Sequence, residues 1–225
     1  MAREYETKRL IAPEHTLIPS HIVYENFEGL EKVGSTGTGT DWEAGRDTWF
    51  IEKGKYSWRQ RPKKTTPAAG DCVYTTFYMP FYIASRVDID TVFLHQTTNN
   101  NVKVRLDFVT SYNTDDIRFA PIVELNCSNG EVKVRDEKGN YQLIDTVSTG
   151  IPKGYWTIFG MSIDLRKQEY LLVRVGQYAK RVSGIKFETF AGFYPCPIVD
   201  LRTTNVSTDR AITFWDAITI FGYFA

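Results

Sequence analysis

The chain has 225 residues, with 27 basic and 27 acidic side chains, so its formal net charge is zero. Opposite charges are interleaved along it, and this lack of a concentrated positive field argues against nucleic-acid binding. No apolar run is long enough to span a bilayer, and the charged first ten residues contain no signal-peptide core, so we expect no membrane partner.

Three widely separated cysteines, Cys72, Cys127 and Cys196, lack the CxxC or Cys/His spacing of a zinc site. We expect them to be buried and reduced, as unpaired cysteines tend to be. Reduced cysteines slightly favour a cytoplasmic location, and the sequence otherwise leaves the compartment open.

Two early segments have the composition of loops. Residues 34–45 are rich in glycine and threonine, and residues 61–70 contain two prolines. We expect both to connect strands at the surface, where functional residues of β-sandwiches often lie.

Beyond these segments, the dominant hydrophobic period is two. Residues 102–108 (VKVRLDF) and 131–135 (EVKVR) alternate apolar and polar side chains, and residues 170–175 (YLLVRV) form a more buried run. This alternation predicts half-buried strands. The pair Asn129-Gly130 predicts a type I′ hairpin turn, and residues 137–140 predict a second turn. About a dozen such short strands, without a helical period, predict an all-β sandwich or barrel.

Five segments follow one another as in a known superfamily. They are residues 24–29 (YENFEG), 54–59 (GKYSWR), 156–165 (WTIFGMSIDL), 169–176 (EYLLVRVG) and 214–220 (FWDAITI). In order and spacing they resemble the strands of the concanavalin A-like lectin/glucanase (laminin G-like) jelly rolls. The resemblance implies a two-sheet antiparallel β-sandwich, with residues 22–225 as a single jelly-roll domain and residues 1–21 as an N-terminal extension or edge strand.

The resemblance also implies a structural calcium site. In many relatives an acidic residue of the opening strand and one of the closing strand bind Ca²⁺, and Glu28 and Asp216 match these positions. Oxygen ligands suit this cation, which needs six to eight of them. Trp215 stands where relatives have a further aspartate, which removes one ligand. The alternative is that these carboxylates only bond turn backbone.

Two carboxylates could carry glycosidase chemistry. Asp88 and Asp90 are two residues apart, so on a strand they face the same side. Retaining glycosidases need two carboxyl groups about 5–5.5 Å apart. The resembling glucanases have a third carboxylate, but Val92 and Phe93 occupy its places here. The alternative is a polar outer face on a half-buried strand.

A second catalytic set resembles that of jelly-roll polysaccharide lyases, which use Arg, Gln, His and Tyr. The chain offers Arg59, Arg61, His95, Gln96 and Tyr178. Elimination next to a uronate needs a cation or amide on the carboxylate and a Tyr or His to move the proton. The local motifs of those lyases are absent, so chance assembly is the alternative.

Aromatic side chains are abundant, with five Trp, thirteen Tyr and fourteen Phe. Trp42, Trp49, Trp58 and Tyr178 lie near expected loops or strand ends and could stack on sugar rings. Aromatic side chains also fill cores and interfaces, so the same residues could serve a core or a homodimer.

The resemblance, together with the supply of aromatic residues, implies a carbohydrate-binding, lectin-like module without catalysis. The expected ligand-binding residues are Trp42, Trp58, Arg59, Gln96 and Tyr178. The alternative is a polysaccharide hydrolase or lyase, for which the expected catalytic residues are Asp88, Asp90, His95 and Tyr178. A second alternative is a structural module that binds protein through a large apolar patch.

Overall fold

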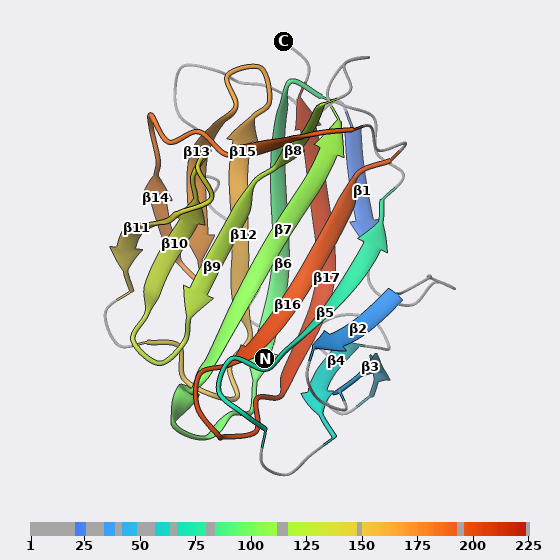
Figure 1. Cartoon of the computed structure of the whole chain (residues 1–225), viewed down its shortest axis with the longest axis vertical. Helices are drawn as coiled ribbons and strands as arrows, with labels where there is room; N and C mark the ends of the chain where they lie inside the picture. The colour runs from blue at the N-terminus through green and yellow to red at the C-terminus, as the bar shows by residue number, and fades with distance from the viewer. Residues whose placement is uncertain are drawn as a thin grey trace, which may run out of the picture.

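The structure, a computed structural model, consists of two antiparallel β-sheets packed face to face (Figure 1). It describes residues 21–25, 34–38, 42–48, 57–63, 67–79, 84–111, 117–147, 150–192 and 196–223. The predicted two-sheet antiparallel β-sandwich is therefore confirmed. Within the described ranges, no helix is long and apolar enough to cross a membrane.

One sheet has eight strands and includes the last strand of the chain. Its path runs through β14 (Tyr178–Arg181), β13 (Glu169–Val175), β12 (Thr157–Asp164), β6 (Arg86–His95), β17 (Thr213–Tyr223), β4 (Ser57–Pro62) and β3 (Trp42–Asp47). The eighth strand, β1 (His21–Glu25), pairs with the second half of β17.

The other sheet has nine strands and faces the viewer in Figure 1. Its path runs through β11 (Tyr141–Thr146), β10 (Glu131–Arg135), β9 (Ile122–Asn126), β7 (Val102–Ser111), β16 (Ile198–Asn205), β5 (Cys72–Tyr78) and β2 (Gly34–Thr38). The remaining two strands, β8 (Ile117–Ala120) and β15 (Glu188–Ala191), extend β7 at one end. The short 3₁₀ turn η1 (Thr98–Asn100) connects β6 to β7.

The core lies between the sheets and follows the period-two pattern. In β7 the apolar side chains of Val102, Val104, Leu106 and Phe108 are buried, so the polar side chains between them face outward. The eight-stranded sheet contributes large aromatic rings, and the Phe93 and Trp215 ring centroids lie 5.6 Å apart. The two inner faces therefore bury one continuous apolar layer.

The hairpin between β9 and β10 is present, but its turn is not type I′. Type I′ needs positive φ at both central residues, and Gly130 has φ +73° while Asn129 has no positive φ. The Asn126 carboxamide accepts the Ser128 N–H at 3.1 Å, and the Asn126 carbonyl accepts the Gly130 N–H. This side-chain bond favours a longer, four-residue connection over the two-residue turn.

The expected loop at residues 34–45 is wrong in part, because β2 and β3 occupy much of it. Thr36 pairs with Tyr74 of β5, and Gly45 pairs with Arg59 of β4. Glycine lowers strand propensity, but backbone N–H and C=O groups of any residue can pair with an open sheet edge. Tertiary pairing therefore overrides the composition.

The expected burial of the three cysteines is confirmed only in part. Cys127 is buried in the core, whereas Cys72 and Cys196 are half-buried. Cys72 begins β5, and Cys196 lies just before β16. Strand ends are less covered than strand centres, which accounts for the difference.

Candidate functional site

Asp88 and Asp90 face the same side of β6, as predicted, on the outer face of the eight-stranded sheet. Both carboxylates have protein partners there. Asp90 accepts a hydrogen bond from Arg174 Nε at 2.6 Å, and Asp88 accepts one from the Tyr223 hydroxyl at 3.1 Å. Burial raises the pKa of Asp90, and Arg174 opposes that rise. The Asp90–Arg174 pair reaches across β12 and joins β6 to β13 on this face.

His95 and Trp58 face the core instead of a surface. The His95 ring is buried, and its Nε2–H donates to the Ile151 carbonyl at 2.8 Å. Burial lowers the pKa of His95, which favours the neutral ring. Trp58 is 8% exposed and donates through Nε1 to Thr75 Oγ1 at 2.9 Å. Neither ring is placed to meet a large ligand.

The other predicted site residues lie apart from one another. Arg59 is on the outer face of the eight-stranded sheet, where it pairs with Glu43 at 3.1 Å and also with Asp47. Gln96 is half-buried just after β6. Tyr178 donates its hydroxyl to Asp145, which joins the edge strands β14 and β11 of the two sheets.

Burial, followed by that hydrogen bond to Asp145, raises the pKa of Tyr178 to about 12. The phenol therefore stays protonated at neutral pH, as its bond to a carboxylate requires. Arg61 pairs with Glu43 beside Arg59. Trp42 lies in β3, but its side chain and the whole of Trp49 fall outside the described residues.

The calcium expectation rests on residues that the structure describes only in part. Asp216 is fully buried in β17, next to a bulge at which Ala217 has φ +53°. Glu28 falls outside the described residues. Within the described ranges, no three His, Cys, Asp or Glu residues form a group that could hold a metal ion. Calcium binding at Glu28 and Asp216 remains a prediction.

A different cluster stands out on the outer face of the nine-stranded sheet. Outward-facing residues of the central strands β7 and β16 form it, together with side chains of β5 and β11. We call this cluster the charged patch, and its members are Tyr74, Thr76, Arg105, Asp107, Tyr141, Asp200 and Arg202.

Strand register brings like residues of the charged patch opposite each other. Arg105 of β7 is paired with Arg202 of β16, and Asp107 with Asp200. On the other side of β16, Arg202 lies opposite Tyr74, and its guanidinium carbon is 5.1 Å from the centre of the Tyr74 ring. Directly opposite residues on one face have Cβ atoms about 4.5–5.5 Å apart. The patch is therefore compact.

The Arg105 side chain is held by two neighbours. Its Nε donates to Asp107 Oδ1 at 2.5 Å, and its Nη2 donates to the other carboxylate oxygen. Its Nη1 donates to the Tyr141 hydroxyl at 3.2 Å. Although they face outward, the Asp107 side chain is only 6% exposed and that of Arg105 17%. This recessed pair gives the patch a rigid centre.

Asp200 and Arg202 differ from that pair. Burial raises the pKa of Asp200, and the nearby Asp107 carboxylate adds to the rise, while Thr76 and the two arginines oppose it. Asp200 Oδ1 and Arg202 Nε are buried atoms without a hydrogen-bond partner among the described residues. Buried polar atoms are normally satisfied, so this part of the patch lacks partners that a ligand could supply.

The sequence contains a pattern of charged residues at these positions, but alternation alone does not show that they form a site. Three charged residues in VKVRLDF and two in IVDLRTT fall on the polar side of a long apolar alternation. Each strand by itself resembles an ordinary solvated face. Only the pairing of β7 with β16, about a hundred residues apart in sequence, makes one cluster from both.

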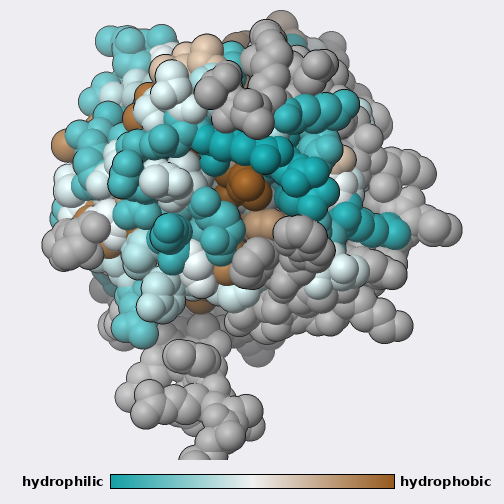
Figure 2. All heavy atoms as spheres, turned by 90° about the horizontal axis from the view of Figure 1, so that it is seen from below, coloured by the Kyte–Doolittle hydropathy of each residue, from teal (hydrophilic) through white to brown (hydrophobic). Residues whose placement is uncertain are grey.

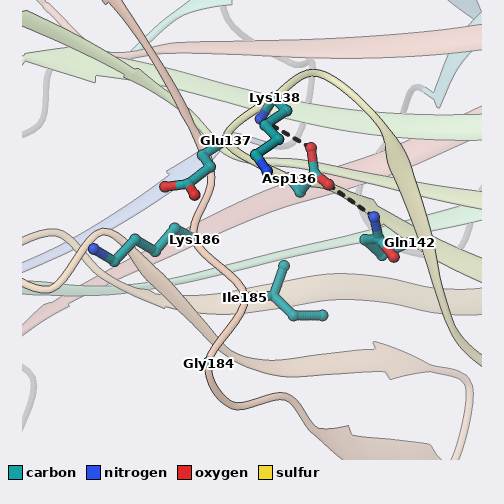
Figure 3. A pocket seen from close by; sticks show the side chains of 7 residues that line it. All are labelled: Asp136, Glu137, Lys138, Gln142, Gly184, Ile185 and Lys186. Carbon is teal, nitrogen blue, oxygen red and sulfur yellow. Dashed lines mark hydrogen bonds between the residues drawn. The ribbon is translucent and has the colours of Figure 1, made fainter.

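One shallow cavity of about 380 Å³ opens beside the turn between β10 and β11 (Figure 3). Asp136, Lys138 and Gln142 line it with the segment 184–186. The Asp136 carboxylate accepts bonds from the Lys138 N–H and from Gln142 Nε2 at 2.9 and 2.7 Å. Its oxygens are thus occupied by the turn, and the cavity offers less to a ligand than the charged patch.

Comparison with known proteins identifies the fold. No protein-family model and no curated protein sequence matches the chain. Alginate lyase vAL-1 from a Chlorella virus has a similar structure, with a TM-score of 0.57 and 8% identity over 86% of this chain and 93% of that chain.

Two further solved structures resemble the chain to a similar degree. A GH16 protein of the Bacteroides ovatus mixed-linkage glucan locus, in complex with its product, has a TM-score of 0.53 and 9% identity over 88% of this chain and 99% of that one. The cellulose-induced protein Cip1 also has a TM-score of 0.53, with 11% identity over 90% and 98%. At such identities the likeness concerns the fold: the chain has the concanavalin A-like jelly-roll fold.

Proposed function

We propose that the chain binds a saccharide on the outer face of the nine-stranded sheet, at the charged patch. The observation that carries this proposal is the pairing of Arg105 with Arg202 and of Asp107 with Asp200, flanked by Tyr74 and Tyr141. This location replaces the scattered set expected from the sequence.

The chemistry of the patch suits a sugar. Hydroxyl groups both donate and accept, and they match carboxylates and guanidinium groups placed side by side. Apolar C–H faces of a sugar ring match tyrosine rings, which combine a flat surface with a polar tip. Tyr141 is 38% exposed, and Tyr78, four residues beyond Tyr74 on β5, is 59% exposed. Exposed aromatic rings therefore border the charged groups.

A hydrolytic function is the second candidate, because Asp107 and Asp200 lie directly opposite each other. Asp107 is bound to Arg105, while burial raises the pKa of Asp200. A carboxylate beside a carboxylic acid is the arrangement that glycoside hydrolysis needs. Among structures that share the fold, one is an alginate lyase and another is a GH16 protein with a bound product.

A protein-binding module receives less support. Exposed large apolar side chains among the described residues are dispersed over β5, β8, β11, β12, β15 and a loop; they are Tyr78, Ile117, Tyr141, Leu143, Tyr155, Ile158 and Phe190. In Figure 2 the described surface at one end of the sandwich is mostly hydrophilic, with a small hydrophobic spot. A stable protein interface usually needs a larger continuous apolar area.

The test is binding of an oligosaccharide panel by calorimetry and by thermal shift. Binding to the native state raises the apparent melting temperature by mass action. We expect Tyr74→Ala and Tyr141→Ala each to weaken binding about tenfold, which corresponds to about 1.4 kcal/mol. Tyr155→Ala, at a 67% exposed position outside the patch, is the matched control and should bind as the native chain does.

Product analysis separates the two candidates. Binding without release of reducing ends or unsaturated products supports a lectin-like module. Release of reducing ends that Asp200→Asn abolishes would instead establish the hydrolase. If Tyr155→Ala weakened binding as much as the patch variants, the site would lie elsewhere.

A further inference from the structure

The two arginines of the charged patch have different charge environments. Arg105 gives three of its N–H groups to Asp107 and Tyr141, so its charge is neutralised. Arg202 forms no ion pair with any described residue and is held by stacking on Tyr74. Its Nε is the buried nitrogen without a partner, so its terminal nitrogens are the donors left to reach a ligand.

The neighbouring carboxyl group, that of Asp200, does not fully neutralise the positive charge of Arg202. Asp200 lies two residues earlier on the same face of β16. It lies opposite Thr76 of β5 and Asp107 of β7. Burial of the Asp200 carboxyl group, followed by the negative charge of Asp107, favours its neutral form. When Asp200 carries its proton, the charged patch holds one cation without a counter-ion.

We infer that the saccharide bound at the charged patch is acidic, and that Arg202 binds its uronate carboxylate. This inference rests on the proposed function. A guanidinium group offers two parallel N–H donors in the geometry that a carboxylate accepts. A hydroxyl next to the uronate carboxylate can donate to the Asp200 carboxyl group. One ligand unit would thus contact both Arg202 and Asp200, the two residues of the charged patch that each have a buried polar atom without a hydrogen-bond partner among the described residues.

The test compares uronic-acid oligosaccharides with their carboxyl-reduced counterparts, which keep the ring and the linkage but lose the charge. The probes are oligomers of galacturonate, glucuronate, and mannuronate with guluronate. Calorimetry should give at least one acidic oligomer a Kd about tenfold or more below that of its reduced form. The difference should shrink at high salt, because salt screens the pair.

Variants assign the effect to Arg202. Arg202→Gln should remove the preference for the acidic form, while Arg202→Lys, which keeps the charge but not the fork, should restore part of it. Arg166→Gln, at an exposed position in the turn after β12, is the matched control and should keep the preference. Circular dichroism and melting temperature show whether each variant is folded.

A pH series provides an independent arm. Affinity for the acidic oligomer should rise as the pH is lowered, because burial raises the pKa of Asp200 and its protonation removes a negative charge beside the uronate. The charged groups that face Asp200 are Asp107, Arg105 and Arg202. Asp200→Asn should bind tightly and lose this pH dependence.

The outcomes are distinguishable. If acidic and reduced oligomers bind equally well and Arg202→Gln changes nothing, the inference is wrong while saccharide binding stands. If no oligomer of either form binds, the proposed function fails and the inference falls with it. If Arg166→Gln loses the preference as Arg202→Gln does, the effect is long-range charge and not a contact.

Discussion

At the residue scale, Gln60 is the polar centre of the sandwich. Its Nε2 donates to Thr75 Oγ1 and to the Leu201 carbonyl, both at 2.9 Å. Its Oε1 accepts from Thr203 Oγ1 at 2.7 Å and from Trp215 Nε1 at 3.1 Å. Gln60 and Trp215 belong to one sheet and the other three to the opposite sheet, so this fully buried amide connects the two layers.

We expect Gln60→Ala to lower the free energy of unfolding by about 3 kcal/mol, because it leaves a cavity and several buried polar groups unsatisfied. Urea denaturation followed by tryptophan fluorescence measures this loss. Gln177→Ala, at an exposed turn position, should change stability by less than about 0.5 kcal/mol. Equal losses in the two variants would refute a special role for Gln60.

At the element scale, several turns between strands contain glycines with positive φ. Two of these glycines allow the cost of backbone strain to be distinguished from the cost of a steric clash. Gly130 has φ +73°, and an added Cβ would lie 2.0 Å from the Val147 carbonyl oxygen. Gly70 has φ +88°, but an added Cβ would meet nothing within 4 Å. Both positions disfavour other residues, and only Gly130 also adds a steric clash.

Gly70→Ala should therefore cost about 1 kcal/mol through backbone strain alone, and Gly130→Ala about 3 kcal/mol or more, because backbone must move. Thermal and urea unfolding of both variants measure the difference. A loss at Gly130 no larger than that at Gly70 would mean that the β9–β10 turn adjusts freely.

At the scale of the whole molecule, both sheets combine strands from both ends of the chain. β17, the last strand, pairs with β6, β4 and β1, and β16 pairs with β7 and β5. Neither sheet can form from one half of the sequence. We propose that the described strands fold as one cooperative unit, in line with the single domain expected for residues 22–225.

Calorimetry should therefore give a single unfolding transition whose calorimetric and van't Hoff enthalpies agree. Truncation after Ile212 removes β17 and its buried Trp215, and it should abolish the transition. Two separate transitions, or a folded truncated chain, would contradict a single unit.

The sequence by itself determined the strand character and the sandwich. Alternation in residues 102–108 assigns Val104 and Leu106 to one face and Arg105 to the other, because side chains on a strand alternate. The order of five strand motifs also indicated the concanavalin A-like jelly roll, which the comparisons support. The sequence did not predict the strands β2 and β3, because their pairing depends on open sheet edges and not on composition.

Only the tertiary structure decided which of these faces could form a site. Alternation predicts that the Asp88 and Asp90 side chains lie on one face of their strand, and that the Trp58 and Arg59 side chains lie on different faces of theirs. It does not predict which face packs on the core or which side chains of other strands lie beside it. Asp90 accepts a hydrogen bond from Arg174. Arg105 and Arg202, which belong to no recognised motif, lie opposite each other on neighbouring strands of the charged patch. The physical reason is that strand period is local, while the register between distant strands is set by the closing of two sheets over one core.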